Sequence, residues 1–199
     1  MIDNIELILP LLIFESDDDF YYLQILQRKK ENAELGSNSR VIKNYYITSK
    51  EYLLKKYDEI KKLCEFFNAR ASIRLNKRSF EKVGFKMLEN TANSMRNREY
   101  KFLNKSYDRA CGQGHDDKYK KWILDIDESD WLDSQTEELV EFLHDLQPVG
   151  NKFITEIPSK SGLHIITKPF NIEEFNRKYK GIEIHKDNPT GLYIPIKNE

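Results

Sequence analysis

The spacing of apolar residues in the first half of the chain predicts three helices separated by two strands. The clearest helix follows Thr48, where apolar residues recur at intervals of three and four positions with Lys and Glu on the opposite side. Short oxygen-bearing side chains, which accept hydrogen bonds from the free amides of a first helical turn, precede each predicted helix. In chain order the expected elements are a helix over 20–32 introduced by Ser16 and Asp19, a strand over 41–47, the helix after Thr48, a strand over 71–76, and a helix that begins at Phe80 after Ser79 and reaches the 90s.

The second half of the chain consists of shorter segments with clear stop signals at Pro and Gly. The expected elements are strands over 122–126, 152–157, 163–167, 182–185 and 192–196 and helices over 137–146 and 172–179. The order β-α-β-β-α-β, followed by one terminal strand, is typical of a ferredoxin-like or RNA-recognition-motif-like (RRM-like) plait. Residues 105–118 have no apolar periodicity, so we expect a lobe boundary there. The predicted fold class is α/β (α+β), with an α/β lobe, 1–118, packed on the plait, 119–199.

Composition and charge narrow the class of protein. The 32 basic and 33 acidic side chains of this 199-residue chain exclude a simple polybasic coat protein for nucleic acid, although a local basic groove is compatible with that balance. Two cysteines, Cys64 and Cys111, cannot build a disulfide framework, which favours a reduced, cytoplasmic protein. The apolar run over 5–14 is interrupted by Glu6 and Pro10 and is shorter than the roughly 20 residues of a membrane-spanning helix, so no membrane partner is expected.

Two acidic residues two positions apart mark the end of the predicted strand over 122–126: the first lies in the strand and the second directly follows it. Because side chains alternate between the faces of a strand, Asp125 and Asp127 point the same way, opposite to Leu124 and Ile126. Their mutual repulsion would be relieved by a divalent cation, and paired oxygen ligands suit Mg²⁺ or Mn²⁺. The alternative is a strand whose polar face meets water, as is common in antiparallel sheets.

A second candidate site follows in the segment 158–169. Ser161 and Gly162 form a small-residue turn whose backbone amides can approach an anion, and His164 is the second residue of the next strand. Lys160 and Lys168 add positive charge on either side. The alternative is that His164 is a surface or hydrogen-bonded core residue. The other histidines, His115 and His144, have no paired spacing that suggests a metal hydrolase.

These two segments together resemble the archaeo-eukaryotic primase superfamily of primase–polymerases. Its first motif is a hydrophobic strand that carries Asp-x-Asp, as at Asp125 and Asp127, and its second is a small residue, any residue and then His. The segment from Ser159 to His164 is similar to the version found in the polymerase domain of bacterial end-joining ligases. The resemblance covers roughly residues 120–190 by motif, and the family fold, an α/β unit packed on an RRM-like plait, agrees with the expected elements.

The resemblance implies a small primase–polymerase-like nucleotidyltransferase that joins nucleotides on a nucleic-acid template with Mg²⁺ or Mn²⁺. It implies that Asp125, Asp127 and Asp187 hold the metal, and that His164 contacts the triphosphate with Lys160, Ser161 and Lys168 as supporting donors. The third motif of the family, a hydrophobic residue followed by Asp, is irregular here because His185 follows Ile184. Rivals of Asp187 for the third ligand position are therefore His185 and Glu183, and a charged turn without any metal role remains the alternative.

The N-terminal lobe offers a further basic group around Asn76. Alternation places Arg74 on the same strand face as Arg70, and Lys77 and Arg78 follow directly. Arg74 and Arg78 are expected to contact the triphosphate or the template, or else to form a solvated strand edge. The segment 36–40, with the basic and tyrosine residues after it, suits single-stranded nucleic acid or, alternatively, the rim of the core.

Two other functions stay open. One is a catalytically inactive primase-like domain that binds nucleotide or single-stranded nucleic acid, which the irregular third motif favours. The other is a plait-fold domain without a nucleic-acid role. For the enzyme, the expected partners are a nucleoside triphosphate, single-stranded or primed nucleic acid and a helicase on a separate chain, and a short primase-like chain of this kind suits DNA replication by a mobile element.

Overall fold

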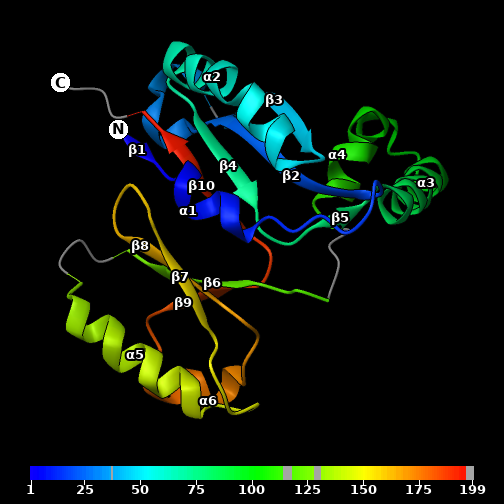
Figure 1. The fold of residues 1–199 in the computed structure, drawn as a ribbon. Coiled ribbons are helices and arrows are strands. Elements are labelled where there is room, and N and C mark those ends of the chain that lie inside the picture. Colours follow the sequence, from blue (N-terminus) through cyan, green and yellow to red (C-terminus); the bar gives the residue numbers. More distant parts are fainter. Residues whose placement is uncertain (37, 114–117, 128–130, 196–199) are drawn as a thin grey trace.

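The computed structural model describes residues 1–36, 38–113, 118–127 and 131–195, which form a mixed α/β protein with two antiparallel sheets (Figure 1). The helices are α1 (Ile5–Ile8), α2 (Lys50–Phe67), α3 (Phe80–Arg96), α4 (Ser106–Cys111), α5 (Asp133–Asp145) and α6 (Ile172–Lys178), with short 3-10 helices at Leu9–Leu11, Lys29–Glu31, Ala33–Leu35 and Tyr100–Lys105. The strands are β1 (Ile2–Asp3), β2 (Asp19–Gln27), β3 (Arg40–Ile47), β4 (Arg70–Arg74), β5 (Arg78–Ser79), β6 (Trp122–Ile126), β7 (Phe153–Pro158), β8 (Leu163–Thr167), β9 (Glu183–His185) and β10 (Pro189–Ile194).

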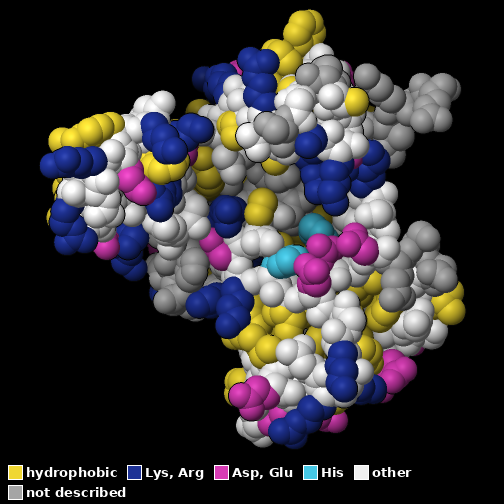
Figure 2. Space-filling view, turned by 180° about the vertical axis from the view of Figure 1, so that it is seen from behind, with side chains coloured by type: hydrophobic (Ala, Val, Ile, Leu, Met, Phe, Trp, Pro, Cys, Tyr) yellow, Lys and Arg dark blue, Asp and Glu magenta, His cyan; other side chains and the backbone are white. Residues whose placement is uncertain are grey.

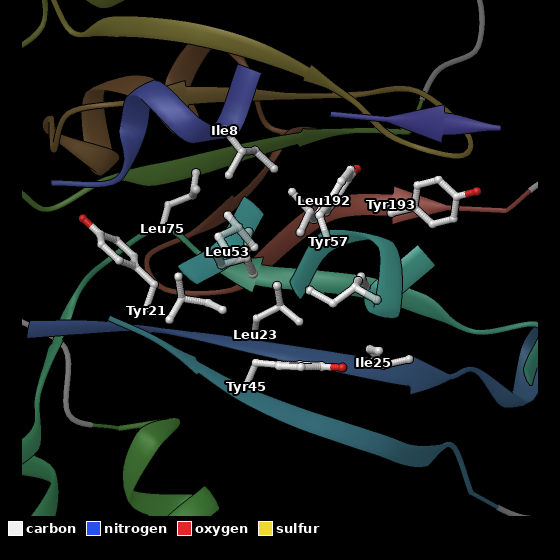
Figure 3. Packing of buried hydrophobic residues seen from close by; sticks show 14 of the residues in the cluster. Ile8, Tyr21, Leu23, Ile25, Tyr45, Leu53, Tyr57, Leu75, Leu192 and Tyr193 are labelled. Carbon is white, nitrogen blue, oxygen red and sulfur yellow. The ribbon is translucent and has the colours of Figure 1, made fainter. Parts of the chain in front are cut away.

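The N-terminal sheet has the strand order β1-β10-β4-β2-β3, with β5 paired to β2. Helix α2 covers one face of this sheet, because its buried residues recur at helical spacing and meet the inward residues of β2 and β4. Figure 3 shows Leu53 and Tyr57 of α2 above Leu23 and Ile25 of β2. The other face of the sheet meets α3 and α4 at one end, through Tyr22 and its neighbours, and is open elsewhere.

The helix expected over 20–32 is wrong, since this segment forms the central strand β2. The carboxylate of Asp19 accepts hydrogen bonds from the amides of Glu15 and Ser16 at 2.6 and 3.1 Å, so it closes a turn before the strand and does not cap a helix. Strand β2 is covered on both faces over most of its length and therefore lacks the alternation that marks a half-buried strand. The other predicted helices and strands are confirmed in place, although Ser49 instead of Thr48 caps α2, α5 begins at Asp133 and β10 runs over Pro189–Ile194.

The C-terminal sheet has the strand order β7-β8-β6-β9, with β6 between β8 and β9. All three pairings are antiparallel. Helices α5 and α6 cover the face that carries Leu124 and Ile126, whereas Ile123 packs into the core cluster shared with the N-terminal sheet. Asp125 alternates with Leu124 and therefore faces the N-terminal lobe.

The two sheets do not divide the chain at the expected boundary. The last strand, β10, leaves the C-terminal half and pairs with β1 and β4 of the N-terminal sheet. The segment 105–118, expected to be the lobe boundary, contains the helix α4, Ser106–Cys111. Residue 37 of the segment 36–40, residues 114–117 with His115, and residue 196 of the last predicted strand lie outside the described residues. Among the helices that the structure describes, none has the length and apolar character that crossing a membrane requires.

Candidate functional site

A cleft of about 350 Å³ opens where the C-terminal sheet meets the open face of the N-terminal sheet. From the C-terminal sheet it is lined by Asp125, Asp127, His164, His185 and the residues Ser159, Lys160 and Ser161; from the N-terminal sheet it is lined by Leu26, Arg28, Arg70 and Ser72. Figure 2 looks onto this side of the molecule, with the histidine and acidic side chains at the boundary between the two lobes and Lys and Arg side chains above them. The site therefore joins an acidic floor to a basic wall.

Strand pairing positions Asp125 between two histidines. In the sheet register Asp125 is opposite His164 of β8 on one side and opposite Glu183 of β9 on the other. Its Oδ1 lies 3.4 Å from Nε2 of His164, and its Oδ2 lies 3.4 Å from Nε2 of His185. The same nitrogen of His185 is 3.4 Å from Oε2 of Glu183. Two antiparallel pairings thus bring together two imidazoles and two carboxylates from three strands.

The ring of His164 is held by a residue from the other sheet. Its Nδ1 lies 2.8 Å from Oγ1 of Thr190, a fully buried residue of β10. Burial lowers the pKa of His164 below its ordinary value, although the carboxylate of Asp125 opposes this shift. A neutral imidazole whose Nδ1 is occupied by Thr190 presents Nε2 to the cleft.

The loop before β8 reaches Asp127. The hydroxyl of Ser161 donates to Oδ1 of Asp127 at 3.1 Å, and the amide of Ser159 donates to the carbonyl of Gly162 at 2.9 Å. A Cβ atom at Gly162 would lie 1.9 Å from the carbonyl oxygen of Ile126, so this close approach of loop and strand requires glycine. Gly162 therefore belongs to the site through backbone packing, and Ser161 through a direct hydrogen bond.

Two cations from opposite sides of the cleft, Arg70 and Lys160, meet at Glu31. Arg70 forms a two-pronged ion pair with Glu31, and Lys160 lies 2.7 Å from Oε1 of the same carboxylate. Arg28 is half-buried, and its guanidinium has no ion pair within the described chain. Arg28 and Ser72 are site residues that the sequence analysis missed.

Asp187 does not lie with Asp125 and Asp127, contrary to the expected third ligand position. Arg78 Nη2 lies 2.5 Å from Oδ2 of Asp187, Arg74 Nη1 lies 3.2 Å from the same oxygen, and the amide of Asn76 donates to Oδ1 at 3.1 Å. The Arg78 side chain is fully buried. These contacts place Asp187, Arg74 and Arg78 in an ion-pair cluster outside the cleft lining. Both rivals lie on β9 next to Asp125: His185 contacts its carboxylate, and Glu183, its register partner, contacts His185.

Lys168 also lies away from the cleft. It follows β8 at the end opposite the loop over 159–162, where its amide donates to the carbonyl of Lys152 at 2.8 Å. It instead lines a separate cavity of about 310 Å³ together with Lys121 and Ile154. The structure thus brings together Asp125, Asp127, His164, Lys160, Ser161 and Gly162 and leaves Asp187, Arg74, Arg78 and Lys168 outside.

The donor set of the cleft suits a hard cation in part. Within the described residues, no Lys or Arg forms an ion pair with Asp125 or Asp127, and carboxylate oxygens are ligands that Mg²⁺ and Mn²⁺ accept. No group of three or more His, Cys, Asp or Glu side chains in this part of the chain is arranged to hold a metal ion as it stands. Asp125 and Asp127 thus offer carboxylate oxygens to the cleft, and the described residues complete no metal-ligand set around them.

No protein-family model, curated protein sequence or solved structure matches the chain. The resemblance to the primase superfamily consequently depends on the residues of the two motifs and on the strand order around them.

Proposed function

We propose that this protein is a primase–polymerase-like nucleotidyltransferase that joins nucleotides on a nucleic-acid template. The observation that carries the proposal is the convergence of Asp125, Asp127 and His164 on one cleft, next to a serine- and glycine-containing loop. The order β7-β8-β6-β9, with helices α5 and α6 on one face, supports an RRM-like plait whose first strand is central. With β6 between β8 and β9, Asp125 lies next to His164 of one neighbouring strand and His185 of the other.

The side chains take distinct roles in this proposal. Asp125 and Asp127 would hold Mg²⁺ or Mn²⁺, which supplies charge neutralisation at the triphosphate and activation of the attacking 3′-hydroxyl. Lys160, Ser161 and the backbone amides of the loop bind the phosphates. His164 is neutral and its Nδ1 contacts Thr190. Its Nε2 is therefore the ring nitrogen that contacts the phosphates.

A second candidate function is a primase-like domain that binds nucleotide without catalysing its transfer. The specific observation in its favour is His185, which occupies the place beside Asp125 where the family has a third carboxylate. An imidazole adds no negative charge, so the site binds a divalent cation less tightly than three carboxylates do. In this alternative the cleft retains the loop and the basic wall, and nucleotide binding depends less on metal.

One pair of variants tests the proposal. Asp125→Asn with Asp127→Asn removes two negative charges from the cleft, whereas Asp58→Asn with Asp145→Asn removes two from side chains that are 84% and 85% exposed elsewhere. We expect the first pair to weaken binding of a nucleoside triphosphate with Mn²⁺ by about 100-fold or more in calorimetry, and to abolish incorporation of labelled nucleotide on primed and unprimed templates.

Three results separate the possibilities. Wild-type incorporation that is retained by the control pair and lost in the cleft pair supports the enzyme. Nucleotide binding without any metal-dependent incorporation supports the inactive domain. Equal behaviour of both pairs in binding and incorporation contradicts a role for the cleft.

A further inference from the structure

A second cavity lies on the same open face of the N-terminal sheet, bounded by the helical segment over 99–112. Its volume is about 870 Å³. Strands β2 and β3 contribute Gln24 and Arg40, and the helical segment contributes Phe102, Lys105, Asp108 and Arg109. It is larger than the candidate site and is not used by the chemistry proposed above.

The two cavities are neighbours along the same strands. On β4, Arg70 and Ser72 line the candidate site and Arg74 lines the second cavity. On β2, Leu26 lines the first and Gln24 the second. Alternate residues of a strand share a face and are about 7 Å apart, so one continuous surface connects the two cavities.

The floor of the second cavity is polar. In the sheet register Gln24 is opposite both Ser72 and Asn44, and its amide donates to Asn44 Oδ1 at 3.1 Å. The carboxylate of Asp108 accepts hydrogen bonds from Tyr22 and Tyr46, at 3.2 and 3.1 Å. Hydroxyl donors thus already satisfy one of the two acidic side chains of the cavity.

Cations and exposed apolar groups surround this floor. Within the described chain Arg40, Lys105 and Arg109 form no ion pair, so these three cations leave the cavity lining with an excess of positive charge over the two carboxylates Glu99 and Asp108. Phe102 is 37% exposed and Val41 is 46% exposed at the same rim. A basic groove that also presents an aromatic ring suits single-stranded nucleic acid, because phosphates meet the cations and bases stack on the ring.

We propose that the second cavity binds the single-stranded template where it passes from the candidate site. The proposal rests on the proposed function in naming the strand a template, but binding of a single strand there is measurable without nucleotide or metal. The phosphates contact Arg40, Lys105 and Arg109, and a base stacks on Phe102. Because the sheet face is continuous, the nucleic-acid strand then passes along it to Arg70 and Arg28, next to the acidic residues of the candidate site.

The test measures binding of a fluorescent oligothymidylate to the full chain, in chelator and without nucleotide. Arg40→Gln with Arg109→Gln is compared with Lys86→Gln and Arg96→Gln, which remove the same charge from α3 outside the cavity lining. We expect the cavity pair to lose affinity at least about tenfold and the control pair less than about twofold. The slope of log affinity against log salt should fall by about 1.4 in the cavity pair, because two phosphates are no longer neutralised by the protein.

Two further variants make the outcome specific. Phe102→Leu should weaken binding by about fivefold or more, because the base can no longer stack on an aromatic ring, while leaving the salt slope unchanged. Asp125→Asn with Asp127→Asn should retain oligonucleotide affinity, so failure of the metal site and failure of this cavity give different results. Equal affinity of the cavity and control pairs, a preference for duplex, or displacement by polyglutamate as efficient as by oligothymidylate would overturn the proposal.

Discussion

Asp125 and Asp187 are acidic residues of comparable exposure that the fold places in opposite surroundings. The side chain of Asp187 is 14% exposed and contacts two guanidinium groups, whereas that of Asp125 is 25% exposed and contacts two imidazoles. Asp187 lies where the chain crosses from β9 to β10, and Asp125 lies at the centre of the C-terminal sheet. One carboxylate has its charge balanced within the protein, and the other does not.

This difference in charge balance indicates a structural role for the region around Asp187 and a binding role for the cleft around Asp125. The amide of Asn76, which contacts Asp187, also donates to the carbonyls of Lys121 and Lys186, so it ties the two crossings of the chain between the lobes to the turn after β4. We call Arg74, Asn76, Arg78, Lys121 and Asp187 the interlobe junction. Removing a carboxylate from such a network leaves buried guanidinium charge unpaired, whereas a carboxylate in a cleft without a cationic partner can accept a ligand.

The largest effect that the comparison predicts is on stability. Asp187→Asn leaves the fully buried Arg78 without its carboxylate partner, and breaking a buried ion pair from one side costs about 3–5 kcal/mol of unfolding free energy. Asp125→Asn, the matched change in the cleft, should alter it by less than about 1 kcal/mol. Urea unfolding followed by tryptophan fluorescence measures both. A larger loss in Asp125→Asn than in Asp187→Asn would contradict the assignment of the two regions.

A smaller effect concerns Lys121 of the interlobe junction. Burial lowers the pKa of Lys121 to about 8, and the neighbouring Lys77 adds to this shift. Because the unfolded chain binds this proton more tightly than the folded one, the unfolding free energy should rise by about 2 kcal/mol between pH 7.5 and 9.5. Lys121→Met removes the buried charge, so it should be more stable than the wild type at pH 7.5, and the difference should narrow as pH rises. Parallel pH dependence in the two proteins would show that Lys121 is solvated.

The sequence reveals the C-terminal sheet better than the N-terminal one, for a physical reason. Strands β6 and β8 are bounded by polar turns and carry apolar residues toward α5 and α6, so pattern and spacing locate them. Most residues of strand β2 are buried whichever face they lie on, and the strand begins with an Asp that resembles a helix cap, so its local pattern is misleading. Assigning 20–32 to a helix also concealed Arg28, which the strand aligns with the cleft.

The candidate site shows a similar division. Asp125, Asp127 and His164 are predictable because two motifs within neighbouring strands carry them. The exclusion of Asp187 is not, since it depends on Arg74 and Arg78, more than a hundred positions away in the chain. A residue close in sequence to a motif can still form ion pairs with residues far away in the chain. The sequence around that residue does not indicate such a pairing.

The smallest predicted effect on stability concerns Gly162 in the cleft. Close backbone packing holds the cleft together, whereas ion pairs hold the interlobe junction. An added Cβ in Gly162→Ala must displace the backbone at Ile126, which we expect to cost about 1–2 kcal/mol of unfolding free energy and to move Ser161 away from Asp127. Gly181→Ala, where nothing lies within 4 Å of the added atom, should be neutral or slightly stabilising. If nucleotide affinity falls in Gly162→Ala more than its small loss of stability explains, the docked loop is part of the binding site. Unchanged affinity would instead show that the loop over 159–162 closes the strand pair without contacting the phosphates.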